Sequence, residues 1–223
     1  MKQEFARRLR AVALGVAACA ALTACAPLLL GGAMVGGAMV ATDRRTSGTI
    51  LDDEGIELKA GSRVREALGD RGNVSATSYN RIVLLTGDVR DAADKATAER
   101  VVAGIENVKS VVNELVVGLA RSVVSRSRDA FLTSKVKASF IDAKDLFSNS
   151  IKVVTAHQTV YLMGRVTERE ANRATEVARG VDGVQKVVRV FEIISEAELA
   201  NALPPQPAAA AAPSPAPSAP SKP

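Results

Sequence analysis

The stretch Val83–Val89, with the sequence VLLTGDV, decides how this chain folds, because it returns as VYLMGRV at Val160–Val166. The apolar positions and the central glycines, Gly87 and Gly164, align at a constant spacing of 77 residues. Each copy is followed by a polar residue, a helical run, a second glycine and a valine-rich strand. Such self-similarity at a fixed spacing is the signature of an internal repeat. The sequence therefore predicts two units of similar fold.

The first unit is predicted to run helix, strand, strand, helix, strand. A first helix follows the acidic residues 52–54, and its apolar face repeats every four residues at Ile56, Ala60, Val64 and Leu68. Strands are expected at 74–77 and 82–89. Asp91 is expected to cap a helix that ends near residue 103, and a last strand spans 107–117.

The second unit repeats this order. A helix is predicted from Asp129 to about Asp142, with the apolar residues Leu132, Val136 and Phe140 facing the core. Strands follow at 151–155 and 159–166. The pattern Thr167-Glu168-Arg169-Glu170 is typical of a capping box at the start of a helix that ends near 179. The last strand is expected at 184–194, with a short helical extension at 195–203.

These patterns predict an α+β fold with two tandem small units, at 50–119 and 126–195. Each unit has the order αββαβ, with a three-stranded mixed sheet packed on two helices. The chain has no Trp, two Tyr and five Phe among 223 residues, so the cores must consist of aliphatic side chains. Small units with thin cores are marginally stable by themselves.

The N-terminus resembles a lipoprotein signal. Residues 1–10 are basic, residues 11–42 contain no charged side chain, and Leu22-Thr23-Ala24-Cys25 is typical of a lipobox. We expect residues 1–24 to be a signal peptide, Cys25 to be lipidated, and residues 25–49 to form a flexible tether. The alternative is an uncleaved transmembrane helix, for which 32 uncharged residues are long enough. Because Ala26 rather than Asp follows Cys25, the sequence indicates the outer membrane.

The C-terminal residues 204–223 hold eight of the nine prolines, together with Ala and Ser. This composition predicts an extended or disordered tail that buries no core.

The composition leaves little material for catalysis. Both cysteines precede residue 26, and the one histidine, His157, lies in a predicted hairpin turn, where we expect it to be exposed. We therefore predict no enzyme activity, no metal and no cofactor. The net charge is +5, but residues 1–24 contribute +3 of it, so no basic stripe indicates a nucleic-acid partner.

Five glycines are assigned structural roles. Gly87 and Gly164 lie within predicted strands, where glycine usually marks a close approach of another backbone. Gly104 and Gly180 fit the position just after a helix, and Gly183 fits a turn. A phosphate-binding loop is the alternative, but no glycine-rich phosphate motif is present.

The first helix of the second unit has an unusual face. At 100° per residue, Arg128, Phe131, Lys135 and Ala138 share a side that points away from the core stripe. An exposed aromatic ring between cations suits a membrane surface, because the ring enters the headgroup boundary and the cations meet lipid phosphates. The alternative is that Phe131 packs on the first unit, and the residues alone favour neither.

The repeat resembles the BON domain family. Its copies end in Gly104-Ile105-Glu106-Asn107-Val108 and Gly180-Val181-Asp182-Gly183-Val184, and a lipobox with two copies resembles the dual-BON lipoproteins. The resemblance implies a periplasm-facing outer-membrane lipoprotein without enzyme activity. Such a protein would support envelope integrity at the division site and bind anionic phospholipid, either phosphatidylglycerol or cardiolipin.

The resemblance also implies that the first helix of the second unit contacts lipid, through Phe131, Lys135 and Lys137. The competing hypothesis is a protein-interaction adaptor for an envelope assembly machine or for a regulator of cell-wall hydrolases, with outer-membrane assembly or cell-wall remodelling proteins as partners.

Overall fold

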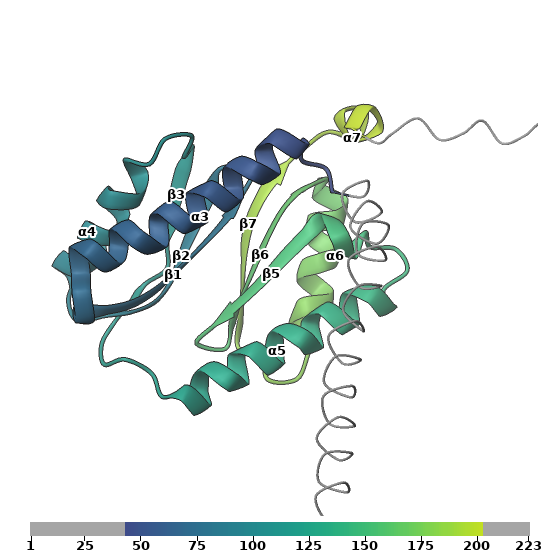
Figure 1. The fold of residues 1–223 in the computed structure, drawn as a ribbon. Helices are drawn as coiled ribbons and strands as arrows, with labels where there is room; N and C mark the ends of the chain where they lie inside the picture. The colour runs from purple at the N-terminus through teal and green to yellow at the C-terminus, as the bar shows by residue number, and fades with distance from the viewer. Residues whose placement is uncertain (1–42, 203–223) are drawn as a thin grey trace, which may run out of the picture. The chain divides into compact units, whose positions relative to one another are not determined.

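The computed structural model describes residues 43–202, and its folded unit begins at Arg44 (Figure 1). The predicted signal peptide, Cys25 and the Pro/Ala-rich tail lie outside the described residues. The fold is α+β, with the αββαβ order present twice, as predicted.

The first copy comprises α3 (Ser47–Leu68), η1 (Gly69–Arg71), β1 (Gly72–Tyr79), β2 (Ile82–Val89), α4 (Ala92–Ala103), β3 (Ser110–Asn113) and β4 (Val116–Val117). The second comprises α5 (Val123–Asp142), η2 (Ser148–Ser150), β5 (Ile151–Ala156), β6 (Thr159–Val166), α6 (Glu168–Arg179) and β7 (Lys186–Ile193). The predicted extension is the short helix α7 (Glu196–Ala202).

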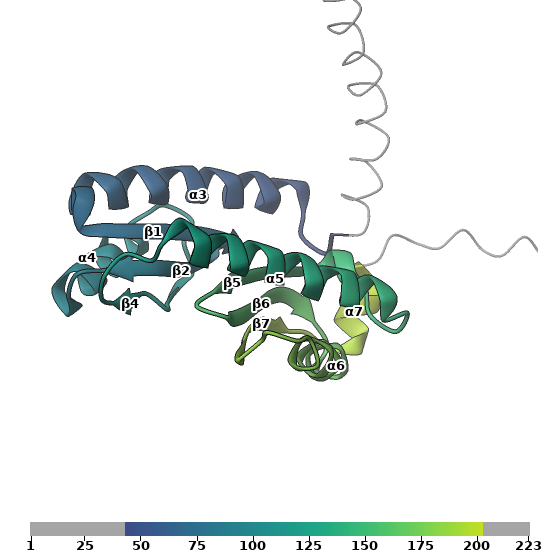
Figure 2. The same ribbon diagram turned by 90° about the horizontal axis from the view of Figure 1, so that it is seen from below.

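The repeated stretch forms the central strand of each sheet. β2 pairs antiparallel with β1 and parallel with β3, and β6 pairs in the same way with β5 and β7. In Figure 2 helix α3 runs along β1, and α5 runs along β5. Both sheets are therefore mixed, because a crossover helix returns the chain to the parallel partner.

Both first helices begin earlier than predicted. Thr46 caps α3 and Ser122 caps α5, each by accepting the amide of the residue three positions on. The sequence predicts starts at the acidic residues 52–54 and at Asp129 instead. Asp53 and Asp129 are buried inside their helices, so they serve tertiary contacts rather than helix starts. Residues 47–49 of the predicted tether thus belong to α3.

The last strand of the first copy is interrupted, which corrects the predicted continuous strand. Leu115, between β3 and β4, turns into the core and is 2% exposed. Its amide donates to the Asn113 side chain rather than to the sheet (3.3 Å). The first sheet therefore has four strands instead of three, since β4 resumes the pairing with β2.

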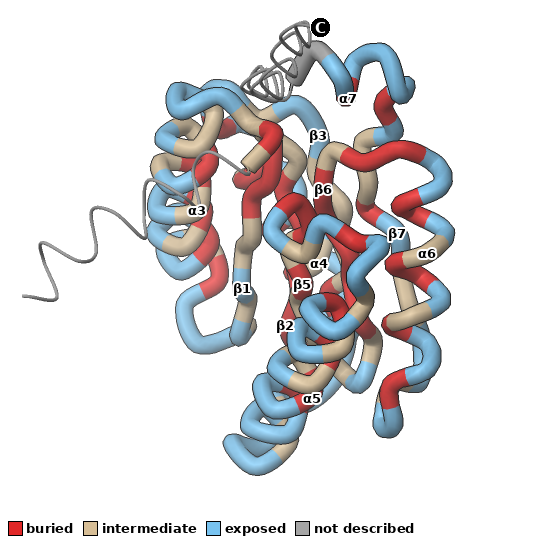
Figure 3. The backbone as a smooth tube through the Cα atoms, turned by 90° about the vertical axis from the view of Figure 1, so that its right-hand side faces the viewer, coloured by how far each residue is buried: buried red, intermediate tan, exposed pale blue. Residues whose placement is uncertain are grey.

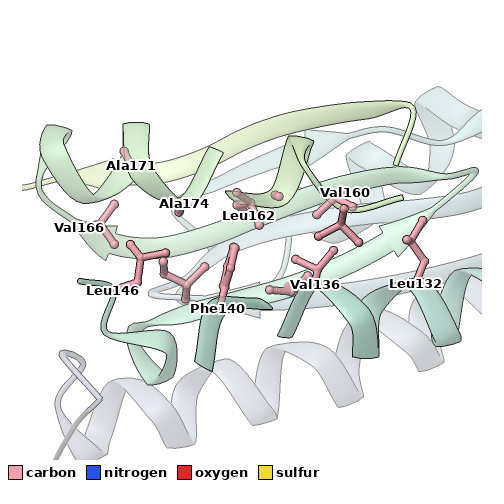
Figure 4. Close-up of a cluster of buried hydrophobic side chains, with 13 residues drawn as sticks. Leu132, Val136, Phe140, Leu146, Val160, Leu162, Val166, Ala171 and Ala174 are labelled. Carbon is pink, nitrogen blue, oxygen red and sulfur yellow. The ribbon is translucent and has the colours of Figure 1, made fainter. Parts of the chain in front are cut away.

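Each copy has its own core between its helices and one face of its sheet. In the first copy the predicted stripe Ile56, Ala60, Val64 and Leu68 packs on Val83 and Leu85. In the second copy Leu132, Val136 and Phe140 point from α5 towards Val160 and Leu162 (Figure 4).

A third core joins the two copies through the other face of each sheet. It contains Tyr79, Leu84, Ala156, Tyr161, Met163 and Val190. Leu84 lies between Val83 and Leu85 in sequence, so β2 is apolar on both faces. The continuous apolar runs of the repeated stretch are typical of strands buried on both sides.

Polar contacts accompany this shared core. Lys152 of β5 donates to Glu57 of α3 (2.7 Å). The Tyr161 hydroxyl donates to Glu114 (3.3 Å), and burial together with that carboxylate raises the pKa of Tyr161 to about 12. The two copies thus form one folded body, with all three cores after residue 43.

Candidate functional site

Helix α5 is fixed to its unit along one side and open to solvent along the other. Its buried residues are Asp129, Leu132, Val136 and Phe140. In Figure 3 the opposite side of the helix is exposed over most of its length. Since the buried stripe sets the rotation of α5, it also sets which side chains point outward.

Asp129 attaches α5 to the hairpin between β5 and β6. Its carboxylate accepts the backbone amides of His157 (3.1 Å) and Gln158 (3.0 Å), and it pairs with Arg121. Both turn residues have positive φ, as a tight two-residue hairpin requires. This arrangement anchors the buried side of the helix one residue after Arg128 and two residues before Phe131.

The first copy contains the same device. Asp53 of α3 accepts the amides of Asn80 (2.8 Å) and Arg81 (2.7 Å), together with hydrogen bonds from Ser78 and Arg45. Burial raises the pKa of such a carboxyl, but here the hydrogen bonds outweigh burial and hold it below the usual 3.8. Asp53 and Asp129 are therefore equivalent residues, and they define which positions of α3 and α5 correspond.

Phe131 is 69% exposed on the outer side of α5. It does not pack on the first copy, contrary to the alternative prediction for this residue. Together with Val124, Arg128 and Lys135 it lines an open groove of about 480 Å³ that ends at Asp182. The structure thus brings the predicted Arg128, Phe131 and Lys135 to one surface.

The cations of this face differ in how far they are engaged. Lys135 donates to the backbone carbonyl of Asp182 (2.7 Å) and lies 3.3 Å from its carboxylate. Arg128 and Lys137 are exposed, and within residues 43–202 neither makes an ion pair. Lys137 does not line the groove, because six residues at 100° each place it about 120° from Phe131 around the helix axis.

Three exposed apolar residues of α5 were not singled out from the sequence: Val123, Val124 and Ile141, which are 62–70% exposed. Val124 lies seven residues before Phe131, which is two helical turns and hence the same side. We name the solvent side of α5 the α5 face; it comprises Val124, Arg128, Phe131, Lys135, Lys137 and Ile141.

The equivalent positions of α3 carry different residues. With Asp53 aligned to Asp129, Arg128 corresponds to Asp52, Phe131 to Gly55, Lys135 to Lys59 and Lys137 to Gly61. A Cβ atom added at Gly55 or Gly61 would meet no atom within 4 Å, so larger residues would fit there. The exposed aromatic ring and most of the cations of the α5 face are therefore additions that the shared fold does not need.

The strand glycines allow the close approach of a neighbouring backbone. Gly87 has φ of 125°, and a Cβ atom there would lie 2.0 Å from the Asn73 carbonyl oxygen. At Gly164 the corresponding distance to the Ser150 oxygen is 2.5 Å.

The other three glycines lie at element ends. Gly104 and Gly180 directly follow α4 and α6. Gly183, with φ of 98°, forms the turn beside Leu132.

His157 is less exposed than predicted. Its side chain is 27% exposed, and its Nε2 atom lies 3.0 Å from a carboxylate oxygen of Asp88 in the other copy. The sequence shows no partner beside His157, because Asp88 reaches it only through the packing of the two sheets.

Over the described residues no helix is sufficiently long and apolar to traverse a bilayer. The same residues contain no cluster of His, Cys, Asp or Glu arranged to hold a metal ion.

Comparison with known proteins gives a consistent picture. The BON domain family model matches residues 52–118 and 128–195. The chain is 39% identical over 176 residues to the outer membrane lipoprotein DolP of Haemophilus influenzae, covering 78% of this chain and 90% of that protein. It is 30% identical to the 21 kDa hemolysin of Actinobacillus pleuropneumoniae, covering 68% of this chain and 79% of that protein. It is 33% identical to the osmotically-inducible protein Y of Escherichia coli, covering 63% of this chain and 72% of that protein.

Proposed function

Because the chain belongs to the BON domain family, we propose that it is a non-enzymatic lipoprotein that binds anionic phospholipid through the α5 face. In this proposal Cys25 anchors the chain in the outer membrane, and the folded unit faces the periplasm. There it supports the integrity of the envelope at the division site.

One observation carries the lipid proposal: Phe131 is exposed between cations on a helix whose other side is fully used by the fold. Transferring a phenylalanine ring from water to an apolar environment is worth about 1.5–3 kcal/mol. Each cation near an anionic surface adds about 1 kcal/mol. Together these contributions favour a peripheral, reversible contact that prefers anionic lipid.

The lipid anchor and the α5 face would act together. Acyl chains on Cys25 would hold the folded unit near the bilayer, because only 18 residues separate Cys25 from Arg44, where the folded unit begins. This confinement raises the effective concentration of the α5 face at the surface, so a weak lipid contact suffices.

Vesicle co-sedimentation tests the proposal, using the chain from residue 43 onward, which contains all three cores. We expect binding to vesicles of phosphatidylcholine with phosphatidylglycerol and little binding to phosphatidylcholine alone. Phe131→Ala with Arg128→Glu should weaken binding by about 100-fold or more, since a ring contact is lost and a charge is reversed.

The matched control changes the equivalent helix of the first copy. Leu58→Ala with Lys59→Glu alters an exposed apolar residue and an adjacent cation of α3. This variant should bind as the unmodified protein does, and circular dichroism should show that both variants are folded. Equal binding to neutral and anionic vesicles would refute the lipid proposal.

A second candidate function is docking of a protein partner, and one observation favours it. Leu51 and Leu58, two helical turns apart on α3, are 70% and 77% exposed. If the protein is an adaptor for envelope assembly or cell-wall enzymes, the α3 control variant should lose partner binding and keep lipid binding.

A further inference from the structure

The linker between the two copies exposes more apolar surface than a connecting segment needs. Leu119 is 96% exposed, and Val116, Val117 and Val123 are 41–68% exposed. Soluble proteins rarely display contiguous apolar residues of this size without a binding role. We name residues 116–123 the linker ridge.

The linker ridge is held in place at both ends. The Gly118 amide donates to the Val89 carbonyl oxygen of β2 (2.8 Å). Arg121 donates to Asp88 of the first copy (3.2 Å) and also pairs with Asp129 of the second. Ser122 then caps α5. Leu119 therefore lies on a backbone segment that hydrogen bonds and ion pairs hold on both sides, at Gly118 and at Arg121.

The linker ridge and the start of α5 carry a positive charge, which suits contact with an anionic surface. Residues 116–128 contain three arginines and no acidic residue. The Arg121 charge is paired with two carboxylates and its side chain is 17% exposed, so it does not oppose insertion of its neighbours. Arg126 and Arg128 remain exposed beside the linker ridge and can meet lipid phosphates.

We propose that the linker ridge is a second membrane contact, which inserts Leu119 into the leaflet that Phe131 touches. This inference rests on the proposed function of the α5 face and extends it. The two surfaces are continuous, because Val123 and Val124 begin α5 and Val124 lines the same groove as Phe131.

The composition of the linker ridge favours an anionic bilayer. Leu119 is 96% exposed, and the surrounding residues 116–128 carry three arginines and no acidic residue. A protruding apolar residue flanked by cations suits the headgroup boundary of a bilayer. With contacts at the linker ridge and along α5, the second copy would lie along the membrane instead of being attached at one point.

The absence of tryptophan from the chain makes a direct test possible. Leu119→Trp, Phe131→Trp and Leu58→Trp each introduce a single fluorescent reporter, the last on α3 as a control. Each full-length lipidated variant is placed in proteoliposomes of phosphatidylcholine with or without phosphatidylglycerol. We expect emission at shorter wavelength and quenching by brominated lipid at positions 119 and 131 in anionic vesicles, and neither change at position 58.

The outcomes separate the two proposals. Quenching at position 131 without quenching at position 119 would overturn the linker contact and leave the α5 face intact. Quenching at neither position would overturn both proposals. Emission at position 119 could also move to shorter wavelength without lipid, increasingly so with protein concentration. That result would show a contact between two molecules of the protein and would also overturn the linker proposal.

A pair of substitutions provides an independent measurement. Leu119→Ser should weaken binding of the chain from residue 43 onward to anionic vesicles by roughly tenfold, because an inserted leucine is lost. Ala120→Ser, at the neighbouring exposed position, should leave binding unchanged. Equal binding by both variants would contradict insertion of Leu119.

Discussion

Helices α3 and α5 hold equivalent positions in the two copies, and their buried faces correspond residue by residue. Asp53, Ile56, Ala60 and Val64 of α3 match Asp129, Leu132, Val136 and Phe140 of α5, and all eight are buried. In each copy the aspartate also accepts the amides of the following hairpin. The buried faces therefore record what the fold requires of this helix.

The solvent faces of the same helices differ. α3 carries three basic and five acidic residues, a net charge of −2, whereas α5 carries four basic and two acidic residues, a net charge of +2. Gly55 of α3 faces solvent where α5 presents Phe131. The proposed binding surface of the second copy therefore lies on a face that folding leaves unconstrained.

If the buried faces are equivalent, removing either aspartate should be equally damaging. We expect Asp53→Ala and Asp129→Ala each to lower the free energy of unfolding by about 3 kcal/mol or more, because buried amides and an arginine lose their partner. Urea denaturation measures this change. Asp142→Ala, an exposed position of α5, should change it by less than about 0.5 kcal/mol. A large effect in only one copy would show that the two devices are not equivalent.

If the solvent faces carry the difference in function, the function should be transferable. Gly55→Phe with Gly61→Lys, introduced into α3 of the Phe131→Ala variant, should raise the affinity of that variant for anionic vesicles at least about tenfold. Both positions have space for a side chain. The helix should also become slightly more stable, since glycine is unfavourable in helix interiors. Vesicle co-sedimentation that shows no recovery would indicate that α5 acts through features beyond its side chains.

Single cations should have smaller effects, which depend on how each is engaged. Lys137→Gln should weaken binding to anionic vesicles by about fivefold, the loss expected for one cation near the surface. Lys135→Gln should have less effect, because Lys135 already donates to Asp182. Lys59→Gln on α3 should have none. Vesicle-binding titrations of the three variants at two salt concentrations measure the order of these effects. A larger loss of binding for Lys135→Gln than for Lys137→Gln would contradict the predicted order.

Much of the fold could be predicted from the sequence, because repeated apolar patterns are local. The core stripes of α3 and α5, the Asp91 cap and the capping box of Thr167 and Glu170 are all confirmed. The helix starts were wrong, since Asp53 and Asp129 resemble helix-capping residues and only tertiary contacts reveal their role.

The contacts between the copies could not be predicted in the same way. The meeting of His157 with Asp88, the pairing of Arg121 with both copies and the exposure of Leu119 all depend on how the two sheets pack. No periodicity in the chain specifies that packing. The helical wheel did place Phe131 on the solvent side of α5, because that result needs only the helix geometry and the core stripe.

The two arginines that precede α3 attach the start of the folded unit to different copies. Arg45 pairs with Asp53 of the first copy (2.7 Å). Arg44 is 3% exposed at its side chain and makes two hydrogen bonds of 2.7 Å to Glu170 of the second copy. Burial raises the pKa of the Glu170 carboxyl, but the Arg44 guanidinium and the Thr167 amide outweigh burial and lower it below the usual 4.5.

A lowered carboxyl pKa predicts the direction of the pH effect. The stabilisation from Glu170 is fully present above the pKa of the unfolded chain, near 4.5, and is lost as the pH falls through the lower folded value. The free energy of unfolding should therefore exceed that of Glu170→Gln by a constant amount from pH 7 to about pH 5, and the difference should narrow below about pH 4.5. Urea denaturation of both proteins at several pH values measures it. A difference that stays constant down to pH 3 would mean that folding does not shift the pKa of Glu170, as expected if Arg44 were held chiefly by the Arg165 carbonyl oxygen (2.9 Å).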